Sequence, residues 1–324
     1  MKKSMLLVLL LSPILLFPQK MSKESQDYKD LVMEYAINYL TPIQKDILQN
    51  HYCGPESYST SIDGKHIPWN KIVSDIEVLD NISTIVHEST HEFTHSESWN
   101  SINLVVSETR FISVPETDNF KANFIVKDML RRNPKVKDMF RFDTYVGSNG
   151  GGSCTGIYDL MNEYCAYYNG TSSALILYAV FKDKHSDNEE EEEFFRDMER
   201  VLAMSMMSSV TAFYEFNSFI GAYLMYAKEN NNEVYTDIIN NSLLVESYST
   251  VTYNFSVIVE EIHEYFPEHE FKIETVWESG SGYVRSSSTY GDNETLLLSQ
   301  EIFNDYIDVL NEFSNSTNLL LTKK

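Results

Sequence analysis

The sequence is poor in positive charge and in cysteine. Its 324 residues include 25 Lys and Arg against 48 Asp and Glu, a formal net charge of -23. Binding a polyphosphate requires neutralisation by Lys and Arg, so this balance argues against nucleic acid and against docking on anionic lipid.

Three cysteines do not make a disulfide framework. We expect Cys53, Cys154 and Cys165 to be isolated buried thiols or to form one bridge at most.

Long apolar runs are absent beyond the N-terminus. There, Lys2 and Lys3 precede an apolar stretch over residues 5–17. This stretch is shorter than the roughly 20 residues of a membrane span and fits a secretory signal peptide over residues 1–20. A retained anchor is the alternative, because no clear cleavage triplet follows. The sequence therefore predicts a secreted, periplasmic or cell-surface protein with no stable membrane span after signal removal.

Apolar residues are plentiful, at 43% with 13% aromatic, which rules out a disordered acidic chain. The chain can bury a core as one large domain or two packed lobes. Apolar periodicity and proline placement predict two short helices over 24–50, a helix over 81–97 and another over 121–133. Alternating β-branched residues predict a hairpin of strands at 101–107 and 110–115.

The remaining segments are predicted from composition. Residues 183–193 form an acidic stretch that fits a solvated connection or a helix N-terminus, while the ordered spacing of a calcium-binding EF-hand loop is missing. From Ile157 onward the chain reads as mostly helical. The other expected elements are a loop-rich region with one strand at 51–79, a strand at 140–147, a glycine-rich loop at 148–156, a helix pair at 194–228 and a final helix at 294–314.

One motif carries chemistry: His87-Glu88-Ser89-Thr90-His91, an H-E-x-x-H. Residues four apart share a helix face, so His87 and His91 can grip one zinc ion. Glu88 then lies beside the metal, where it can take a proton from a water whose pKa the zinc has lowered. The preceding Ile85 and Val86 suit a helix buried behind the metal. This pattern is typical of zinc metallopeptidases.

The motif overlaps a second copy of itself. His91-Glu92-Phe93-Thr94-His95 is also H-E-x-x-H, but its lead-in is polar. We therefore favour the first register. His95 is then either a polar helix end or an outer partner of the site.

Zinc needs a third protein ligand in addition to two histidines. The third histidine of metzincins is absent, since Thr94 and Glu97 occupy the positions of the motif's glycine and final histidine. A glutamate from a later helix fits better. Glu163 lies in an apolar helical segment over 156–170, and Asn162-Glu163 followed by Ala166 resembles the N-E-x-x-A/S element of gluzincins. Asp159, one turn earlier, is a candidate for orienting a ligand histidine.

The oxyanion of the transition state also needs a hydrogen-bond donor. Tyr290 is our first choice, because its loop resembles the Ser-x-Tyr-Gly element of some toxin-type gluzincins. Leu297, however, stands where those proteins have a glutamate ligand, so the loop cannot supply their metal ligand. The alternatives are Tyr283, Tyr167, Tyr168, His263 and His269.

The chain thus resembles zincins of the gluzincin type over two short helical segments. The resemblance implies an α+β, zincin-like fold. Its N-terminal α+β lobe, residues 21–150, would carry a small sheet and the H-E-x-x-H helix, and its mainly helical lobe, residues 151–324, would carry Glu163. It also implies a secreted zinc peptidase that binds a peptide or protein substrate along the edge of the sheet. Two alternatives stay open: a catalytically inactive metallopeptidase-like binding or surface-interaction protein, and a helical protein with a fortuitous motif.

Overall fold

A computed structural model describes residues 23–54, 75–96, 100–147, 154–266 and 293–314. This part of the chain is mainly helical and contains one two-stranded antiparallel sheet. The predicted combination of a small sheet with helices is present, with the helices dominating. The elements that surround the candidate site are α4 (Asp75–Thr94), β1 (Ser101–Ser107), β2 (Arg110–Pro115), α7 (Ile157–Phe181), α8 (Glu189–Asn230) and α10 (Ser242–Tyr265).

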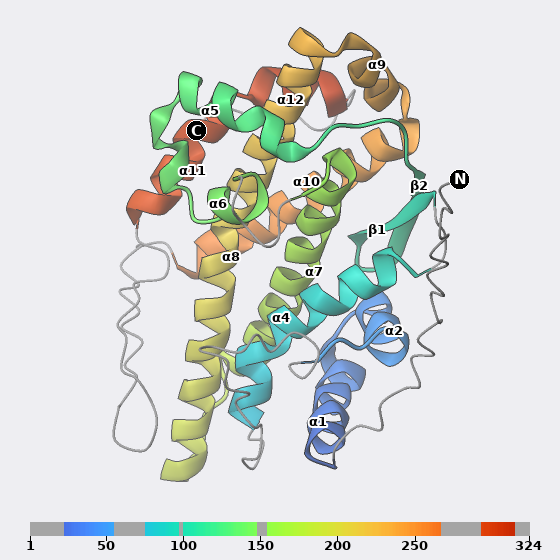
Figure 1. The fold of residues 1–324 in the computed structure, drawn as a ribbon. Helices are drawn as coiled ribbons and strands as arrows, with labels where there is room; N and C mark the ends of the chain where they lie inside the picture. Colours follow the sequence, from blue (N-terminus) through green and yellow to red (C-terminus); the bar gives the residue numbers. More distant parts are fainter. Residues whose placement is uncertain (1–22, 55–74, 97–99, 148–153, 267–292, 315–324) are drawn as a thin grey trace, which may run out of the picture.

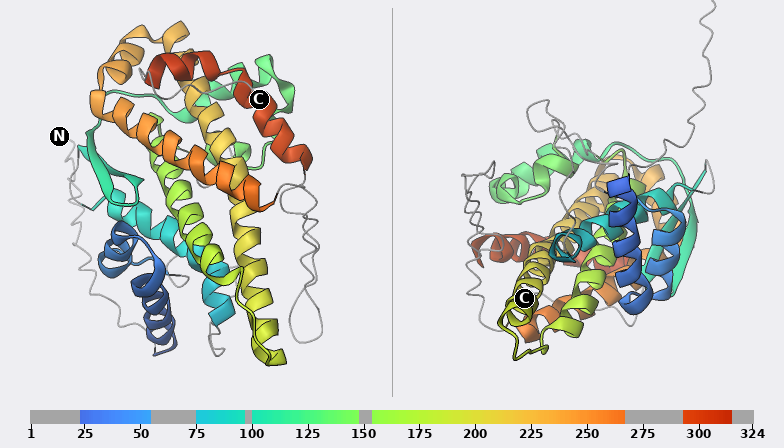
Figure 2. Two further views of the ribbon diagram at one scale, coloured as in Figure 1. Left: turned by 180° about the vertical axis from the view of Figure 1, so that it is seen from behind. Right: turned by 90° about the horizontal axis from the view of Figure 1, so that it is seen from below.

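Helix α7 occupies the centre of the molecule. It runs antiparallel to α8, and α4 crosses it on the face seen in Figure 1. Helix α10 lies across its opposite face, as the left view of Figure 2 shows. Residues all around α7 are consequently buried, including Leu160, Tyr164, Cys165 and Leu177. This explains why its sequence is apolar on every side instead of along one stripe.

The two predicted N-terminal helices are present as α1 (Lys23–Tyr39) and α2 (Pro42–Asn50). Thr41 caps the second helix: its hydroxyl accepts from the Gln44 backbone N–H, and the Gln44 side chain accepts from the Thr41 N–H. Pro42 stands in the first turn of α2, where its missing N–H costs no hydrogen bond. Gln44 also donates to the Asn169 carbonyl at 3.0 Å, which ties α2 to the central helix.

The sheet pairs Ile102 with Val114 and Leu104 with Ile112, as expected for the predicted hairpin. It packs against α7 and α10. The carbonyl groups of Val105 and Val106 accept side-chain amides from these two helices, from Asn169 at 3.1 Å and Asn254 at 2.8 Å. The β1 backbone is therefore partly bonded to helices, and substrate binding along a strand edge stays a prediction.

The upper part of the molecule in Figure 1 is built from short elements. The predicted helix over 121–133 appears as a 3-10 turn followed by α5. These elements and the C-terminal ones are η2 (Ala122–Ile125), α5 (Val126–Arg132), η3 (Pro134–Asp138), α6 (Phe142–Tyr145), α9 (Asn232–Asn240), α11 (Asn293–Asn304) and α12 (Ile307–Ser314).

The strand predicted over residues 140–147 was wrong. Aromatic and β-branched residues favoured a strand there, but the segment forms the short helix α6. The Val146 and Gly147 amides both donate to the Phe142 carbonyl, closing the turn. The turn is fixed by burial of Phe142 and of the neighbouring Arg141 side chain.

Several helix boundaries also differ from the sequence prediction. The helix predicted over 81–97 is α4, which begins at Asp75, within the segment expected to be loop-rich, and ends at Thr94. The expected helix pair over 194–228 is one continuous helix, α8, whose buried positions recur without a proline break. The expected single helix over 294–314 is two, because the chain turns at Asp305 and Tyr306. Tyr306 packs against Gly221 of α8, where a Cβ atom would come within 2.5 Å of the tyrosine. The acidic stretch contributes the first turn of α8, as predicted, with Asn188 as its cap.

Several expectations fall outside the described residues: the signal peptide over 1–20, most of the loop-rich region over 51–79 and most of the glycine-rich loop. The division into lobes at residue 150 stays a prediction. Cys53, Cys154 and Cys165 are buried and form no disulfide with one another, which confirms the expectation of isolated buried cysteines. Among the described residues, none of the helices has the length and apolar character that a membrane crossing requires.

Candidate metal centre

Helix α4 carries the H-E-x-x-H motif and is anchored by its apolar side. Ile82, Ile85 and Val86 are fully buried, whereas His87 and Glu88 are partly exposed. The Ser89 hydroxyl accepts a hydrogen bond from the Cys53 backbone N–H at 2.9 Å, which fixes the helix to the chain after α2. The motif residues are thus held on a helix whose rotation is set by the core.

A close crossing brings α4 against α7. At Gly170 a Cβ atom would come within 2.6 Å of the Ser83 carbonyl oxygen, so only glycine allows the two backbones to approach this closely. Gly170 lies about two turns after Glu163 on α7, and Ser83 lies about one turn before His87 on α4. The crossing therefore sets the distance between the two halves of the site.

The side chains of His87, His91 and Glu163 converge at this crossing. The two Nε2 atoms are 3.0 Å apart, and the Glu163 Oε2 lies 3.5 Å from that of His87 and 3.4 Å from that of His91. Donor atoms about 2.0–2.1 Å from a tetrahedral zinc ion lie about 3.3 Å from one another. The convergence predicted from the sequence is present, and these three residues form a group that could hold a metal ion.

The environment of Glu163 suits a ligand. Its Oε2 is buried and receives no hydrogen bond of regular geometry. Burial by itself would raise the pKa of this carboxyl, but the short contacts with His87 and His91 and their charge lower the pKa to about 2. For His91, burial disfavours the charged ring, yet the contact with Glu163 and its charge outweigh burial and raise the pKa. Two imidazoles and a carboxylate with an unsatisfied oxygen are a donor set that fits zinc.

Asn162 orients one ligand. Its Oδ1 lies 3.0 Å from the Nδ1 of His91, so that Nε2 is left to face the site. Its Nδ2 lies 3.3 Å from the Nε2 of His95. His95 therefore contacts Asn162 and is not part of the converging group. Asp159, our candidate for orienting a histidine, lies in the first turn of α7 and instead accepts a hydrogen bond from the Thr155 backbone N–H at 2.8 Å.

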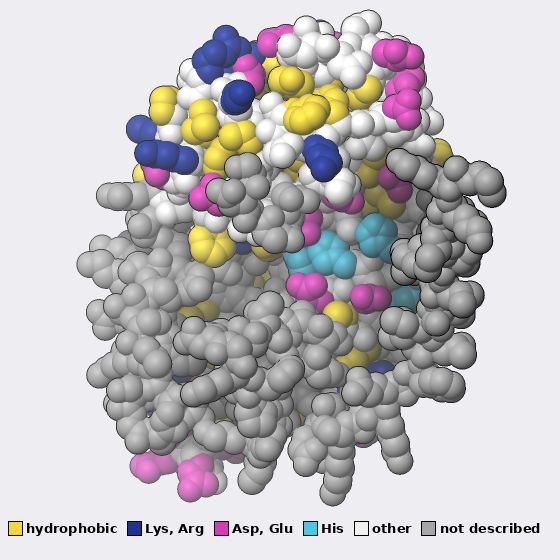
Figure 3. Space-filling model, viewed as in Figure 1, with side chains coloured by type: hydrophobic (Ala, Val, Ile, Leu, Met, Phe, Trp, Pro, Cys, Tyr) yellow, Lys and Arg dark blue, Asp and Glu magenta, His cyan; other side chains and the backbone are white. Residues whose placement is uncertain are grey.

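A pocket of about 140 Å³ opens beside the converging group. It is lined by His87, Glu88, Tyr145 and Tyr167, together with Ser83, Thr84 and Gly170. The Tyr145 and Tyr167 hydroxyls are 3.0 Å apart, and the Tyr167 ring packs edge-on against the His87 ring at 4.5 Å. The pocket thus contains the motif carboxylate and two phenols. Histidine side chains gather in one region of the face seen in Figure 1, with acidic side chains beside them (Figure 3).

A buried ion pair supports the wall of this pocket. The Arg141 Nη1 donates to the Glu215 Oε2 at 2.9 Å, and both side chains are almost completely buried. The guanidinium lies 4.4 Å from the centre of the Tyr167 ring. Arg141 therefore packs against the Tyr167 ring in a cation–π contact, while Glu215 balances the charge of the guanidinium.

The structure places the other candidates away from this group or does not describe them. Tyr290, Tyr283 and His269 lie outside the described residues. Tyr168 faces a different cavity, and His263 lies in the last turn of α10. Sequence reasoning missed Tyr145, which no motif marks, and it quoted Asn162 without giving it a role.

Comparison of the chain with protein-family models, curated proteins and solved structures finds no match.

Proposed function

We propose that the protein is a zinc-dependent peptidase of the zincin type, similar to gluzincins, and that it acts after export through its N-terminal segment. The observation that carries this proposal is the convergence of His87, His91 and Glu163 next to a pocket lined by Glu88. If the motif were fortuitous, we would not expect a carboxylate from a helix about 70 residues later to converge on its two histidines.

Each residue has a distinct task in this proposal. His87, His91 and Glu163 would hold Zn²⁺, and Asn162 keeps His91 in the required tautomer. When bound, zinc supplies Lewis acidity, which lowers the pKa of a water towards neutrality and polarises a substrate carbonyl. Glu88 accepts the proton of that water and passes it to the leaving amine.

The two pocket phenols are our candidates for donors to the developing oxyanion. Tyr167 was among the alternatives from the sequence, and Tyr145 joins it because their hydroxyls are within hydrogen-bond distance. One phenol can donate to the other while the second donates to the substrate oxygen. Whether Tyr290 contributes stays a prediction.

The experiment that tests the proposal compares Glu88→Gln with Glu92→Gln. Glu92 lies one turn later on α4, is exposed and is the carboxylate of the alternative motif register. With a mixture of internally quenched peptides, Glu88→Gln should reduce kcat by about 10²–10⁴ while keeping one equivalent of zinc. Glu92→Gln should leave both unchanged.

Three outcomes contradict this assignment. Full hydrolysis by Glu88→Gln removes that residue as the base, and a wild-type protein without stoichiometric zinc contradicts the metal site. A wild-type protein that holds zinc but cleaves none of the peptides supports the inactive, binding alternative instead.

A further inference from the structure

We propose that a groove on the α10 side of α7 binds a polypeptide segment with basic ends and an apolar middle. The groove is separate from the metal centre, which lies on the α4 side of α7. The idea that the bound segment belongs to a substrate rests on the proposed function, whereas peptide binding in the groove is independent of it.

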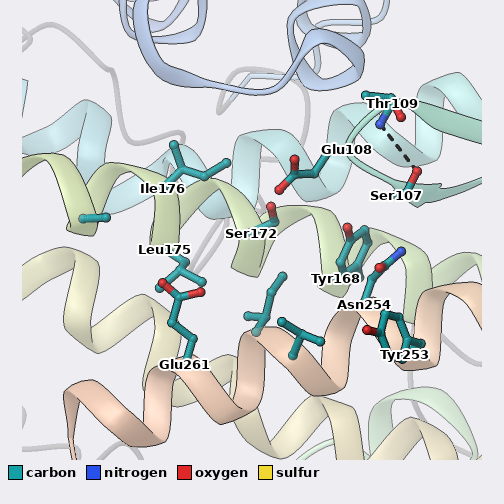
Figure 4. Close-up of a pocket in the computed structure, with 13 residues that line it drawn as sticks. Ser107, Glu108, Thr109, Tyr168, Ser172, Leu175, Ile176, Tyr253, Asn254 and Glu261 are labelled. Atoms are coloured by element: carbon teal, nitrogen blue, oxygen red, sulfur yellow. Dashed lines mark hydrogen bonds between the residues drawn. The ribbon is translucent and has the colours of Figure 1, made fainter. Parts of the chain in front are cut away.

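The groove lies between α7, α10 and the turn that joins β1 to β2 (Figure 4). Its volume is about 500 Å³, within the range of pockets that hold ligands. On α10 it extends from Tyr253 to Glu261, which at 1.5 Å per residue is about 12 Å. An extended chain advances about 3.3 Å per residue, so the groove accommodates roughly four residues.

The charge of the groove is of one sign. Glu108 from the β-turn and Glu261 from α10 line it, and no Lys, Arg or His among the residues that the structure describes does. Within the described part of the chain neither carboxylate forms an ion pair, although Glu261 accepts a hydrogen bond from the Tyr265 hydroxyl at 3.2 Å. Two uncompensated carboxylates at one cavity favour a ligand that carries positive charge.

Two hydroxyl-bearing side chains of α7 form a second, independent feature. Tyr168 and Ser172 are each only 3% exposed, lie one turn apart on α7 and line the groove (Figure 4). Among the described residues neither hydroxyl has a hydrogen-bond partner. Neither hydroxyl oxygen is a buried atom without a partner, so both are open to the groove. A peptide backbone in the groove would supply donors and acceptors to them.

Apolar side chains complete the groove and define its occupant. Leu175, Ile176, Val257 and Ile258 lie along it, and Tyr253 adds an exposed ring. A small inorganic cation would leave this apolar surface unused. A segment such as Lys-Leu-Leu-Lys places aliphatic side chains against it and ammonium groups within reach of the carboxylates.

The test uses a fluorescein-labelled peptide, acetyl-Lys-Leu-Leu-Lys-amide, and measures anisotropy on the full chain carrying Glu88→Gln so that the probe is not cleaved. We expect saturable binding that weakens with added salt. The double variant Glu108→Gln/Glu261→Gln should weaken binding about tenfold, since each half-exposed charge pair accounts for about two- to fivefold. Ala179→Trp, an exposed position that lines the groove, should weaken it without changing charge.

The matched control is Glu116→Gln/Glu260→Gln, which removes two exposed carboxylates that do not line the groove. It should change binding by less than twofold. Equal weakening by both double variants would show attraction by the overall charge of -23 and overturn the groove. So would unchanged binding in the Ala179→Trp protein, or equally tight binding of the acidic analogue Glu-Leu-Leu-Glu.

A second measurement separates this inference from the proposed function. Glu163→Gln should lose zinc but bind the probe as tightly as the parent chain, because the groove and the metal centre use opposite sides of α7. Loss of zinc or of activity in the wild-type protein therefore contradicts the peptidase proposal alone. If hydrolysis is observed, a substrate peptide whose sequence is extended by Lys-Leu-Leu-Lys should have a KM about tenfold lower than the unextended peptide, with the same kcat. An unchanged KM would contradict the substrate role.

Discussion

Two glutamates near the candidate site, Glu163 and Glu215, are held in different ways. Glu215 is fully buried, and each of its oxygens has a donor: the Phe140 backbone N–H at 2.8 Å and the Arg141 guanidinium at 2.9 Å. Glu163 is partly exposed, and its Oε2 faces two imidazoles without receiving a regular hydrogen bond. Arginine is permanently charged, whereas histidine is the side chain that changes charge near neutral pH.

This difference distinguishes a structural ion pair from a candidate metal site. Arg141 also donates to the Thr211 hydroxyl and the Ser208 carbonyl, so the pair around Glu215 is nearly complete without any ligand. Glu163 and its two histidines leave three donor atoms pointing at one another, an arrangement that a cation completes. Burial of a carboxylate alone therefore does not identify a metal ligand. The nature of its partners does.

The largest effect that we predict is on stability, at the structural pair. Glu215→Gln leaves the Arg141 guanidinium buried and uncompensated, and should lower the free energy of unfolding by about 3–5 kcal/mol. Urea unfolding monitored by circular dichroism measures this. The matched control is Glu246→Gln, which breaks an exposed pair with Arg110 and should cost less than about 1 kcal/mol. Equal losses in the two variants would contradict the structural role.

The corresponding change at the metal centre should act on zinc instead of on folding. Glu163→Gln removes one of the proposed ligands. A structural zinc site with four ligands binds with roughly 10–16 kcal/mol, so an equal share for one ligand is about 3 kcal/mol of zinc affinity. Competition with a chromophoric chelator measures the affinity. Asp159→Asn, on the same helix, is the control and should keep zinc. One tightly bound equivalent of metal in Glu163→Gln would remove Glu163 from the site.

Much of the fold could be predicted because local rules and tertiary packing agree. Thr41 followed by Pro42 and Gln44 marks a helix start by its capping chemistry, and the structure has it there. In the hairpin, β2 alternates in burial as its sequence predicts, whereas β1 is buried at five consecutive positions, Ile102 to Val106. The prediction failed over 140–147, where the burial of Arg141 against Glu215, 74 residues away, decides the conformation. No local pattern carries that information.

The site shows the same division. His87, Glu88 and His91 lie within one helix, so their spacing alone predicts a shared face. Glu163 was predicted from an apolar helix that contains one carboxylate. Tyr145 could not be found, because it reaches the pocket only through the packing of α6 beside α7. The hydrogen bond that the Asn162 Oδ1 accepts from the His91 ring likewise depends on the crossing at Gly170, which the sequence does not reveal.

A smaller effect is expected from the residue that orients His91. Asn162→Ala removes the partner of Nδ1 and should lower zinc affinity about 10–100-fold. His95→Ala removes only the contact with the Nδ2 of Asn162 and should change zinc affinity less than threefold. Both variants can be measured in the chelator competition. If His95→Ala weakens zinc binding as much as Asn162→Ala, the alternative motif register regains support.

The smallest effect should be the pH dependence of stability, which distinguishes the zinc-bound from the metal-free form of the group around Glu163. In the metal-free protein, Glu163 has a lowered pKa, so its contribution to stability is full above its unfolded value near 4.5 and is lost as the pH falls towards about 2. His91 has a raised pKa, so its contribution is full below 6.5 and is lost as the pH rises through the raised value. The stability difference between wild type and Glu163→Gln, measured in chelator, should therefore peak between about pH 4.5 and 6.5.

Zinc should reverse this profile, because the metal requires neutral imidazoles and its affinity rises with pH through the raised pKa of His91. Thermal unfolding with saturating zinc should accordingly show the stability difference between wild type and Glu163→Gln increasing from pH 6 to pH 8. Glu215→Gln should show neither profile, since arginine does not titrate in this range. If the difference for Glu163→Gln falls with pH in zinc as it does in chelator, protons and metal do not compete for these atoms, and the group is an ion pair like that of Glu215.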